Sequence, residues 1–300
     1  MGEPQSERQH MKYCVFLTSL YTRSLPIVRS QTNKIFVLAA KLKRKYSPRS
    51  EKVAISPIDE LLAAEVARLW RNILQASRDQ IFEGAEEAIV DRWHGNDRLP
   101  QPGFVGLNYE RGGLLLIGQN PGNDGVGKGL SRADQLQYQL LIRLRDAEDS
   151  EVVGAYTELM NALGSTVMPS WKIVRNVVYP LLRALDGQTL NHIAYTNLVK
   201  FRTVDSKFNR TIYDASWSAT IDQINLLKPA LIVALGAGTF NQLQRRYKGT
   251  VPIKKVRRQI GDSGLPAAGR SDIAEIAAFW RSRKRKAGEV FPTPPSPPAR

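Results

Sequence analysis

The sequence predicts an α/β protein with three α/β/α layers, in which helices cover both faces of a central, mainly parallel, four-stranded sheet. Short aliphatic runs bounded by glycine, proline or polar residues alternate with helical patterns along the chain. Runs of four or five apolar residues are too short for helices and suit strands that are buried on both faces. The four predicted strands are residues 114–117, 193–196, 231–235 and 251–256.

The predicted helices follow from amphipathic periodicity and start signals. Ser56 caps the first helix and Pro57 takes its first position, where a missing N–H is tolerated. Its apolar face consists of Ile58, Leu61, Leu62, Val66, Leu69 and Ile73. Further helices are predicted at residues 135–145, 151–163, 171–185, 215–227 and 238–247, and a last one carries Ile273, Ile276, Ala277 and Trp280. This alternation of strands and helices is typical of a parallel sheet.

We expect one α/β domain at residues 53–284, preceded by a basic, disordered extension at residues 1–52 and followed by a proline-rich disordered tail at residues 285–300. Most of the formal net charge of +15 lies in the two ends of the chain. An organelle transit sequence and an over-long gene model both fit the first segment. The basic run at residues 281–286 also fits a nuclear-localisation signal.

Composition narrows the class of protein. Hydrophobic residues make up 42% of the chain and charged residues 24%, as in ordinary globular domains. The single cysteine, Cys14, excludes an intramolecular disulfide framework. The three histidines show no ligand spacing, so we expect no metal and no other cofactor. No apolar run approaches the roughly 18 residues of a membrane span. We expect an intracellular monomer of the cytoplasm or nucleoid, with nuclear or organellar targeting left open.

Glycine-rich or polar loops follow all four predicted strands. The first strand runs into Gly118-Gln119-Asn120-Pro121-Gly122 and the second into Asn197. The third runs into Gly236-Ala237-Gly238, and the fourth into residues 261–266. The carboxyl ends of parallel strands open on one edge of the sheet, where α/β proteins place their ligand chemistry. The sequence therefore predicts a functional site at this edge.

The first and second of these segments carry a family resemblance. Gly118-Gln119-Asn120-Pro121-Gly122 resembles the first motif of the uracil-DNA glycosylase superfamily, in the Gly-x-Asn-Pro-Gly form of the mismatch-specific and thymine-DNA glycosylase branch. Residues 196–202, Thr-Asn-Leu-Val-Lys-Phe-Arg, resemble the Thr-Asn-x-x-Lys-Cys-Arg segment of the thermostable bacterial branch. Residues 228–236 are similar to that branch's next strand, and the resemblance covers roughly residues 114–265.

The resemblance implies a monofunctional DNA glycosylase that flips a base out of DNA and hydrolyses its bond to the sugar. Asn120 would hold the attacking water, and the backbone around Gln119 would contact the base. Asn197 can donate and accept at once, which suits the edge of uracil. Ser263 and Gly264 would bind a phosphate, and Leu265 would fill the gap left by the flipped base.

Two parts of the family pattern are missing. Residues 261–265, Gly-Asp-Ser-Gly-Leu, keep the Ser-Gly-Leu of the closing motif but have no histidine or proline before the serine. Residues 123–129 contain no aromatic to stack on the base, which leaves Tyr138 and Phe201 as candidates. A basic cluster upstream supplies candidate phosphate contacts, namely Lys254, Arg257 and Arg258.

Two other readings stay open. The fold could be kept without catalysis, as a nucleic-acid-binding module. Alternatively, Gly122-x4-Gly127-Lys128 is close to a phosphate-binding P-loop, although Gly129 stands where that motif needs Ser or Thr.

Overall fold

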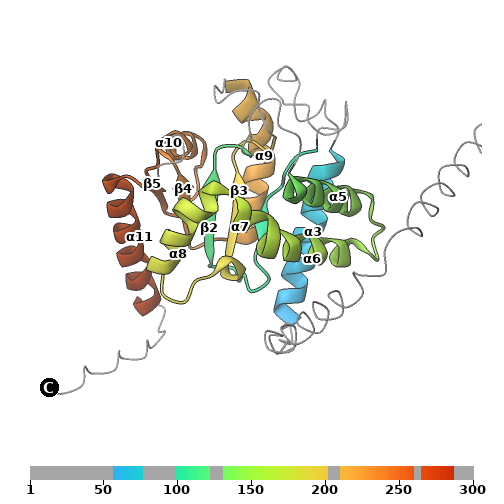
Figure 1. Ribbon diagram of the computed structural model, residues 1–300, viewed down its shortest axis with the longest axis horizontal. Coiled ribbons are helices and arrows are strands. Elements are labelled where there is room, and N and C mark those ends of the chain that lie inside the picture. Colours follow the sequence, from blue (N-terminus) through green and yellow to red (C-terminus); the bar gives the residue numbers. More distant parts are fainter. Residues whose placement is uncertain (1–56, 77–98, 122–130, 202–209, 260–264, 287–300) are drawn as a thin grey trace, which may run out of the picture. The chain divides into compact units, whose positions relative to one another are not determined.

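The computed structural model describes residues 57–76, 99–121, 131–201, 210–259 and 265–286 (Figure 1). All of them belong to the unit that runs from Ile55 to Arg300. The predicted extension at residues 1–52 and most of the predicted tail lie outside the described residues. The domain boundaries given above therefore stay predictions.

A five-stranded sheet forms the centre of the fold, in the order β1-β3-β2-β4-β5. Strands β2 (Leu114–Gly118), β3 (Ile193–Asn197), β4 (Leu231–Leu235) and β5 (Ile253–Val256) run parallel, and the short β1 (Phe104–Val105) pairs antiparallel with β3. The predicted α/β class is confirmed. The prediction of four strands missed β1, because two residues show no periodicity that could be read from sequence.

Hydrophobic burial explains why the three central strands lie where they do. Every residue of β2, β3 and β4 is buried. The continuous aliphatic runs of β2 and β4 therefore pack against helices on both faces, as a parallel sheet requires. Most of the buried core belongs to one cluster that includes these strands and the helices around them.

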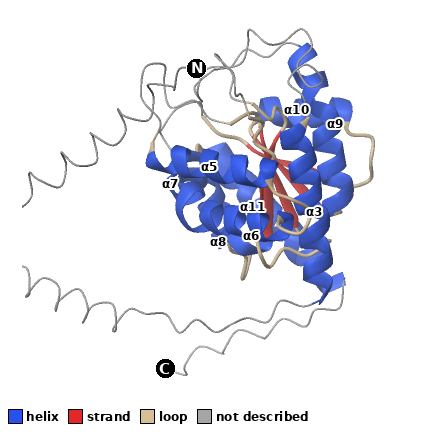
Figure 2. Cartoon of the chain, turned by 90° about the vertical axis from the view of Figure 1, so that its right-hand side faces the viewer, coloured by secondary structure: helices blue, strands red, loops and turns tan. Residues whose placement is uncertain are grey.

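Helices lie on both sides of the strands (Figure 2). One side carries α5 (Arg132–Asp146), α6 (Val152–Ala162), α7 (Met168–Ser170) and α8 (Tyr179–Ala184). The other side carries α9 (Arg210–Leu227) and α10 (Ala237–Arg246). α3 (Pro57–Gln75) contacts α5, α6 and α9, and α11 (Ala267–Lys286) contacts α8 and β5. Among the described residues, no helix is both long and apolar enough to cross a membrane.

The helix predicted at residues 171–185 is present from residue 172 to residue 184, but the gap predicted before it, at residues 164–170, is helical as well. α7 ends at Ser170 and Trp171 is extended; the chain re-enters a helix at Lys172, which continues through a π-helical turn, η3 (Val174–Val178), into α8. A similar turn, η2 (Leu163–Val167), links α6 to α7. Each π-helical turn lies just before a proline, Pro169 or Pro180. A proline ring clashes with the carbonyl four residues earlier, and a wider turn relieves that clash.

The segment before β1 brings a side chain to the carboxyl edge of the sheet. Because β1 is antiparallel to β3, the residues that precede it lie beside the carboxyl end of β3. Gln101 N donates to Lys200 O at 2.7 Å, which extends this pairing. Gly103 has φ +124°, and a Cβ there would lie 2.4 Å from Tyr195 O. Only glycine therefore fits where this segment approaches the backbone of β3.

Candidate functional site

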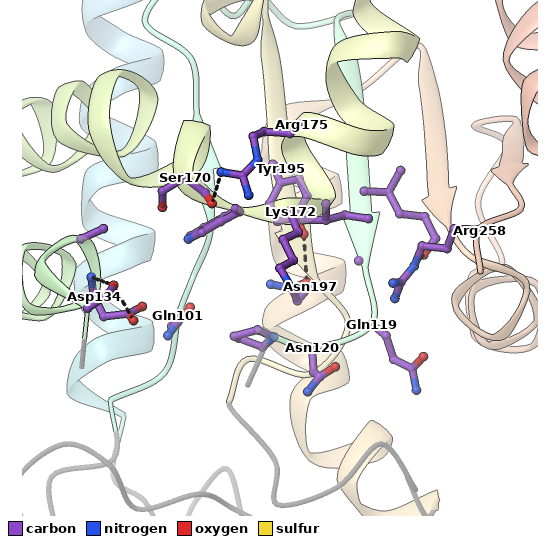
Figure 3. A pocket seen from close by; sticks show the side chains of 17 residues that line it. Gln101, Gln119, Asn120, Asp134, Ser170, Lys172, Arg175, Tyr195, Asn197 and Arg258 are labelled. Carbon is purple, nitrogen blue, oxygen red and sulfur yellow. Dashed lines mark hydrogen bonds between the residues drawn. The ribbon is translucent and has the colours of Figure 1, made fainter. Parts of the chain in front are cut away.

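A cavity of about 510 Å³ lies at the carboxyl edge of the sheet (Figure 3). The ends of four parallel strands contribute to it: Gly118 to Pro121 after β2, Asn197 at the end of β3, Leu235 at the end of β4, and Arg258 after β5. The predicted convergence of the first motif with Asn197 is confirmed. The loop at residues 260–264 lies outside the described residues.

The register of β2 and β3 places Asn197 beside Gly118. A Cβ on Gly118 would lie 2.4 Å from Asn197 Oδ1 and 2.9 Å from the Tyr195 hydroxyl oxygen. Both distances are shorter than any stable contact with carbon. Gly118 is therefore required for close approach, and the Asn197 carboxamide occupies the space that another side chain would fill.

The hydroxyl of Tyr195 fixes the orientation of Asn197. It donates to Asn197 Oδ1 at 3.5 Å, and both side chains are buried. Burial raises the pKa of Tyr195 to about 12, and the nearby Arg258 opposes this shift only in part. The hydroxyl therefore stays protonated at neutral pH. Because Oδ1 faces Tyr195 and Gly118, the amide nitrogen of Asn197 is the part of the group that can donate to a ligand.

A buried lysine holds the carboxyl end of β3 in place through hydrogen bonds. Lys200 is fully buried, and its ammonium donates to Thr196 Oγ1 at 2.8 Å, Asn197 O at 2.7 Å and Gln223 Oε1 at 2.7 Å. Burial lowers the pKa of Lys200 well below its usual value. All three N–H groups have acceptors, so Lys200 serves to hold the strand end in place.

The first motif continues the pairing of β2 with β3 beyond the strands themselves. Leu198 N donates to Gly118 O and Val199 N to Gln119 O, both at 2.9 Å. The Gln119 side chain donates to the Tyr213 hydroxyl of α9 at 3.2 Å. Asn120, which follows, is half-buried and lines the cavity. The backbone on which Gln119 and Asn120 stand is therefore held by hydrogen bonds to β3 and α9.

Two walls of the cavity were missed by sequence reasoning. One comes from Gln101 together with the first turn of α5, where Ser131 Oγ donates to Asp134 Oδ2 at 2.8 Å. The other is a five-residue part of the α7–η3 connection: Ser170, Trp171, Lys172, Ile173 and Arg175. The available signal was one aromatic with two basic residues within five positions, but these residues were predicted to lie in the first turns of a helix that starts at Trp171, and Trp171 itself was assigned to packing.

The predicted phosphate contacts Lys254, Arg257 and Arg258 lie in three different settings. Arg258 lines the cavity, and its Nε donates to Leu235 O at 3.1 Å. Arg257 forms an ion pair with Asp272 of α11, with N···O distances of 2.7 to 3.2 Å. Lys254 lies over the Phe279 ring at 5.5 Å, also on α11. Only Arg258 of the three lines the cavity.

The predicted stacking residues do not line the cavity. Tyr138 on α5 and Phe201 after β3 are both buried, with 7% and 2% of their surfaces exposed. The aromatic side chains that do line it are Trp171 and Tyr195, whose rings pack against each other at 6.0 Å with a tilt of 53°. Sequence reasoning assigned these two to packing, which is also what they do.

The closing motif is described only at its last residue. Ser263 and Gly264 lie outside the described residues, so their predicted phosphate contacts stay predictions. Leu265 is half-buried and packs against the core next to Gly269 of α11.

No histidine is among the described residues that line the cavity. His192 lies at the amino end of β3, opposite the cavity, where its Nδ1 pairs with Thr189 Oγ1 at 2.9 Å and helps to cap a short helix. Within the described ranges, no group of three His, Cys, Asp or Glu side chains is placed to hold a metal ion.

Neither protein-family models nor curated protein sequences give a match to this chain. The resemblance of its motifs to the uracil-DNA glycosylase superfamily therefore stays an expectation.

The contact between Gly118 and Asn197 makes a stability prediction. Gly118→Ala should lower the free energy of unfolding by about 1–3 kcal/mol, because the new Cβ overpacks two buried side chains. Urea unfolding measures the change. The control is Gly154→Ala on α6, where a Cβ meets nothing within 4 Å; alanine there should be neutral or stabilising. Equal stability of the Gly118 variant and the wild type would show that Asn197 is free to move.

Lys200→Met should lower the free energy of unfolding by about 1–3 kcal/mol at neutral pH, because buried acceptors lose their donor. The folded state of the wild type has a lowered lysine pKa, so the unfolded chain binds more protons up to an ordinary pKa of about 10.4. Wild-type stability therefore rises with pH in that window, and the gap to the variant should widen toward about pH 9.5.

Urea unfolding at the two pH values tests the Lys200 prediction. Lys228→Met is the matched control, since Lys228 is exposed. This control should show a gap that does not change with pH. A constant gap for Lys200→Met as well would mean that the Lys200 ammonium is not desolvated.

Proposed function

We propose that this protein is a monofunctional DNA glycosylase that removes uracil or a related damaged or mismatched base from DNA. The observation that carries the proposal is a set of carboxamide side chains around one cavity. Among the described residues these are Gln119 and Asn120 after β2, Asn197 at the end of β3, and Gln101 in the segment before β1. Carboxamides both donate and accept hydrogen bonds, as the Watson–Crick edge of a base requires. A cavity of about 510 Å³ is ample for one nucleobase and part of its sugar.

The reaction in this proposal is hydrolysis without a covalent enzyme intermediate. The bond between C1′ and the base nitrogen breaks, and its electron pair leaves with the base. A water oxygen bonds to C1′, and one water proton passes to the base or to solvent, which yields an abasic sugar and the free base. Asn120 Oδ1 accepts a hydrogen bond from this water and orients it.

Negative charge that develops on the departing base would be stabilised by the cavity itself. The Asn197 amide nitrogen, held in place by Tyr195 and Gly118, is a pre-oriented donor. Among the described lining residues, three are cations, Lys172, Arg175 and Arg258, and one is a carboxylate, Asp134. An amide cannot remove a proton from water as a carboxylate does, so we expect slow turnover.

A nucleic-acid-binding module without catalysis remains the second candidate. No histidine that could stabilise the departing base is found among the described residues that line the cavity. The P-loop alternative depends on Gly122, Gly127, Lys128 and Gly129, which lie outside the described residues. No observation on the cavity favours it.

Asn120→Ala should reduce base release by about a hundredfold, because the attacking water loses its orientation. The assay uses oligonucleotides with uracil in a single strand, opposite adenine or opposite guanine, with hypoxanthine and mismatched thymine as further substrates. Alkaline cleavage reports the abasic sites.

The matched control for this experiment is Asn225→Ala, an exposed asparagine on α9 that does not line the cavity. It should release the base at the wild-type rate. Wild-type protein that releases none of these bases would refute the proposed function, and salt-sensitive binding without release would favour the binding module.

A further inference from the structure

The α7–η3 connection supplies one complete wall of the cavity. Trp171 is extended and ends α7, and its carbonyl accepts hydrogen bonds from Val174 N and Arg175 N at 3.1 Å. The turn is therefore closed on itself by the start of the next helix. It presents an aromatic, a lysine and an arginine to the same cavity within five residues.

The two cations of this wall lie at its exposed rim. Lys172 and Arg175 are exposed, and Arg175 Nη1 donates to Ser170 O at 3.0 Å, which folds the guanidinium back along the turn. Arg258 enters from another side of the cavity, fixed by its hydrogen bond to Leu235 O. In Figure 3, Lys172 and Arg175 lie on one side of Asn197, Asn120 lies on the other, and Arg258 lies beside Asn197.

Charge and hydrogen-bonding groups are thus divided within the cavity. Three carboxamides lie at or just after the ends of β2 and β3 and a fourth lies in the segment before β1, whereas the positive charges of the described lining residues lie on the α7–η3 wall and after β5. A free base would need only the carboxamides. A nucleotide inside a strand would also bring phosphates on both sides of its sugar, and these require cations at the rim.

We infer that the α7–η3 connection is the strand-binding wall of the protein. Trp171 stacks on the base that enters the cavity, and Lys172 and Arg175 contact the flanking phosphates. The ligand class is therefore a DNA strand and not a free nucleoside. The inference rests on the proposed function for the choice of DNA, but its residues do not include Asn120 and its test measures binding of DNA and not release of a base.

The phosphate contacts are tested by the salt dependence of binding. Fluorescence anisotropy with a labelled thymidine oligonucleotide that lacks uracil avoids any turnover. Arg175→Gln should reduce the slope of log K against log salt by about 0.7 on a single strand and about 0.9 on a duplex, the values for one lost phosphate contact. Lys172→Gln should give a similar reduction.

Arg183→Gln is the matched control for charge. Arg183 is exposed on α8, close in sequence, and does not line the cavity. It should leave the slope unchanged. Equal slopes for Arg175→Gln, Lys172→Gln and Arg183→Gln would overturn the inference.

The stacking role of Trp171 is tested with a uracil-containing single strand in the Asn120→Ala background. Trp171→Leu should weaken binding by between about fivefold and a hundredfold, the range for loss of one base–aromatic stack. Trp171→Phe should retain most of the affinity, and it also keeps the aromatic packing against Tyr195. Wild-type affinity in the folded leucine variant would overturn the stacking role.

Failure of the inference and failure of the proposed function give different results. If the wild type releases a base but the slopes do not depend on Arg175 or Lys172, the glycosylase proposal stands and the wall is wrongly assigned. If the slopes depend on these residues but no base is released, the wall binds DNA and the proposed chemistry is wrong. If wild-type protein binds neither strand, both are wrong.

Discussion

The close approach of Asn197 to Gly118 constrains the whole edge of the sheet on which the cavity lies. It requires the register of β2 with β3, a glycine at position 118 and a hydroxyl on Tyr195 to orient the carboxamide. The same pairing continues past the strands, so the backbone of Gln119 is held by Val199. Groups that stand on strand ends are placed more accurately than groups on free loops. Asn120 and Asn197 therefore belong to one rigid frame.

This frame is stabilised mainly by neutral hydrogen bonds and one buried ammonium. Lys200 gives all its donors to groups around the end of β3 and has Gln223 as a side-chain acceptor in place of a carboxylate. Gln223 in turn donates to Pro102 O at 2.6 Å, which ties β3 to the segment before β1. No charge of this network faces the cavity. The Asn197 carboxamide is thus oriented by neutral groups, and the cations that line the cavity come from other segments, namely Lys172, Arg175 and Arg258.

The sequence predicted the central strands and their convergence because both depend on local patterns: aliphatic runs, and polar loops at parallel strand ends. It did not predict β1, which exists only through its pairing with β3, or the break between helices at Trp171. The basic cluster near the end of the sheet does not form one surface, for a simple reason. Side chains alternate along β5, so Lys254 faces Phe279 on α11 and Lys255 faces Phe240 on α10. A run of like charges in a strand is divided between two faces.

The carboxamides that would contact the base are neutral, whereas the side chains that would contact phosphates are cations. This division explains how a weak catalytic group such as an amide can suffice for hydrolysis. An amide at position 120 orients water but does not activate it, so little acceleration comes from that group alone. Binding energy gained at phosphates far from the reacting bond can offset the extrusion of a base and its orientation against the water. In this protein, that binding energy would come from phosphate contacts with the α7–η3 wall and Arg258. The rigid backbone around Gly118 and Asn197 would then hold the base in line with the attacking water. The rate of such an enzyme would depend as much on how tightly it binds the phosphates of the DNA strand as on Asn120.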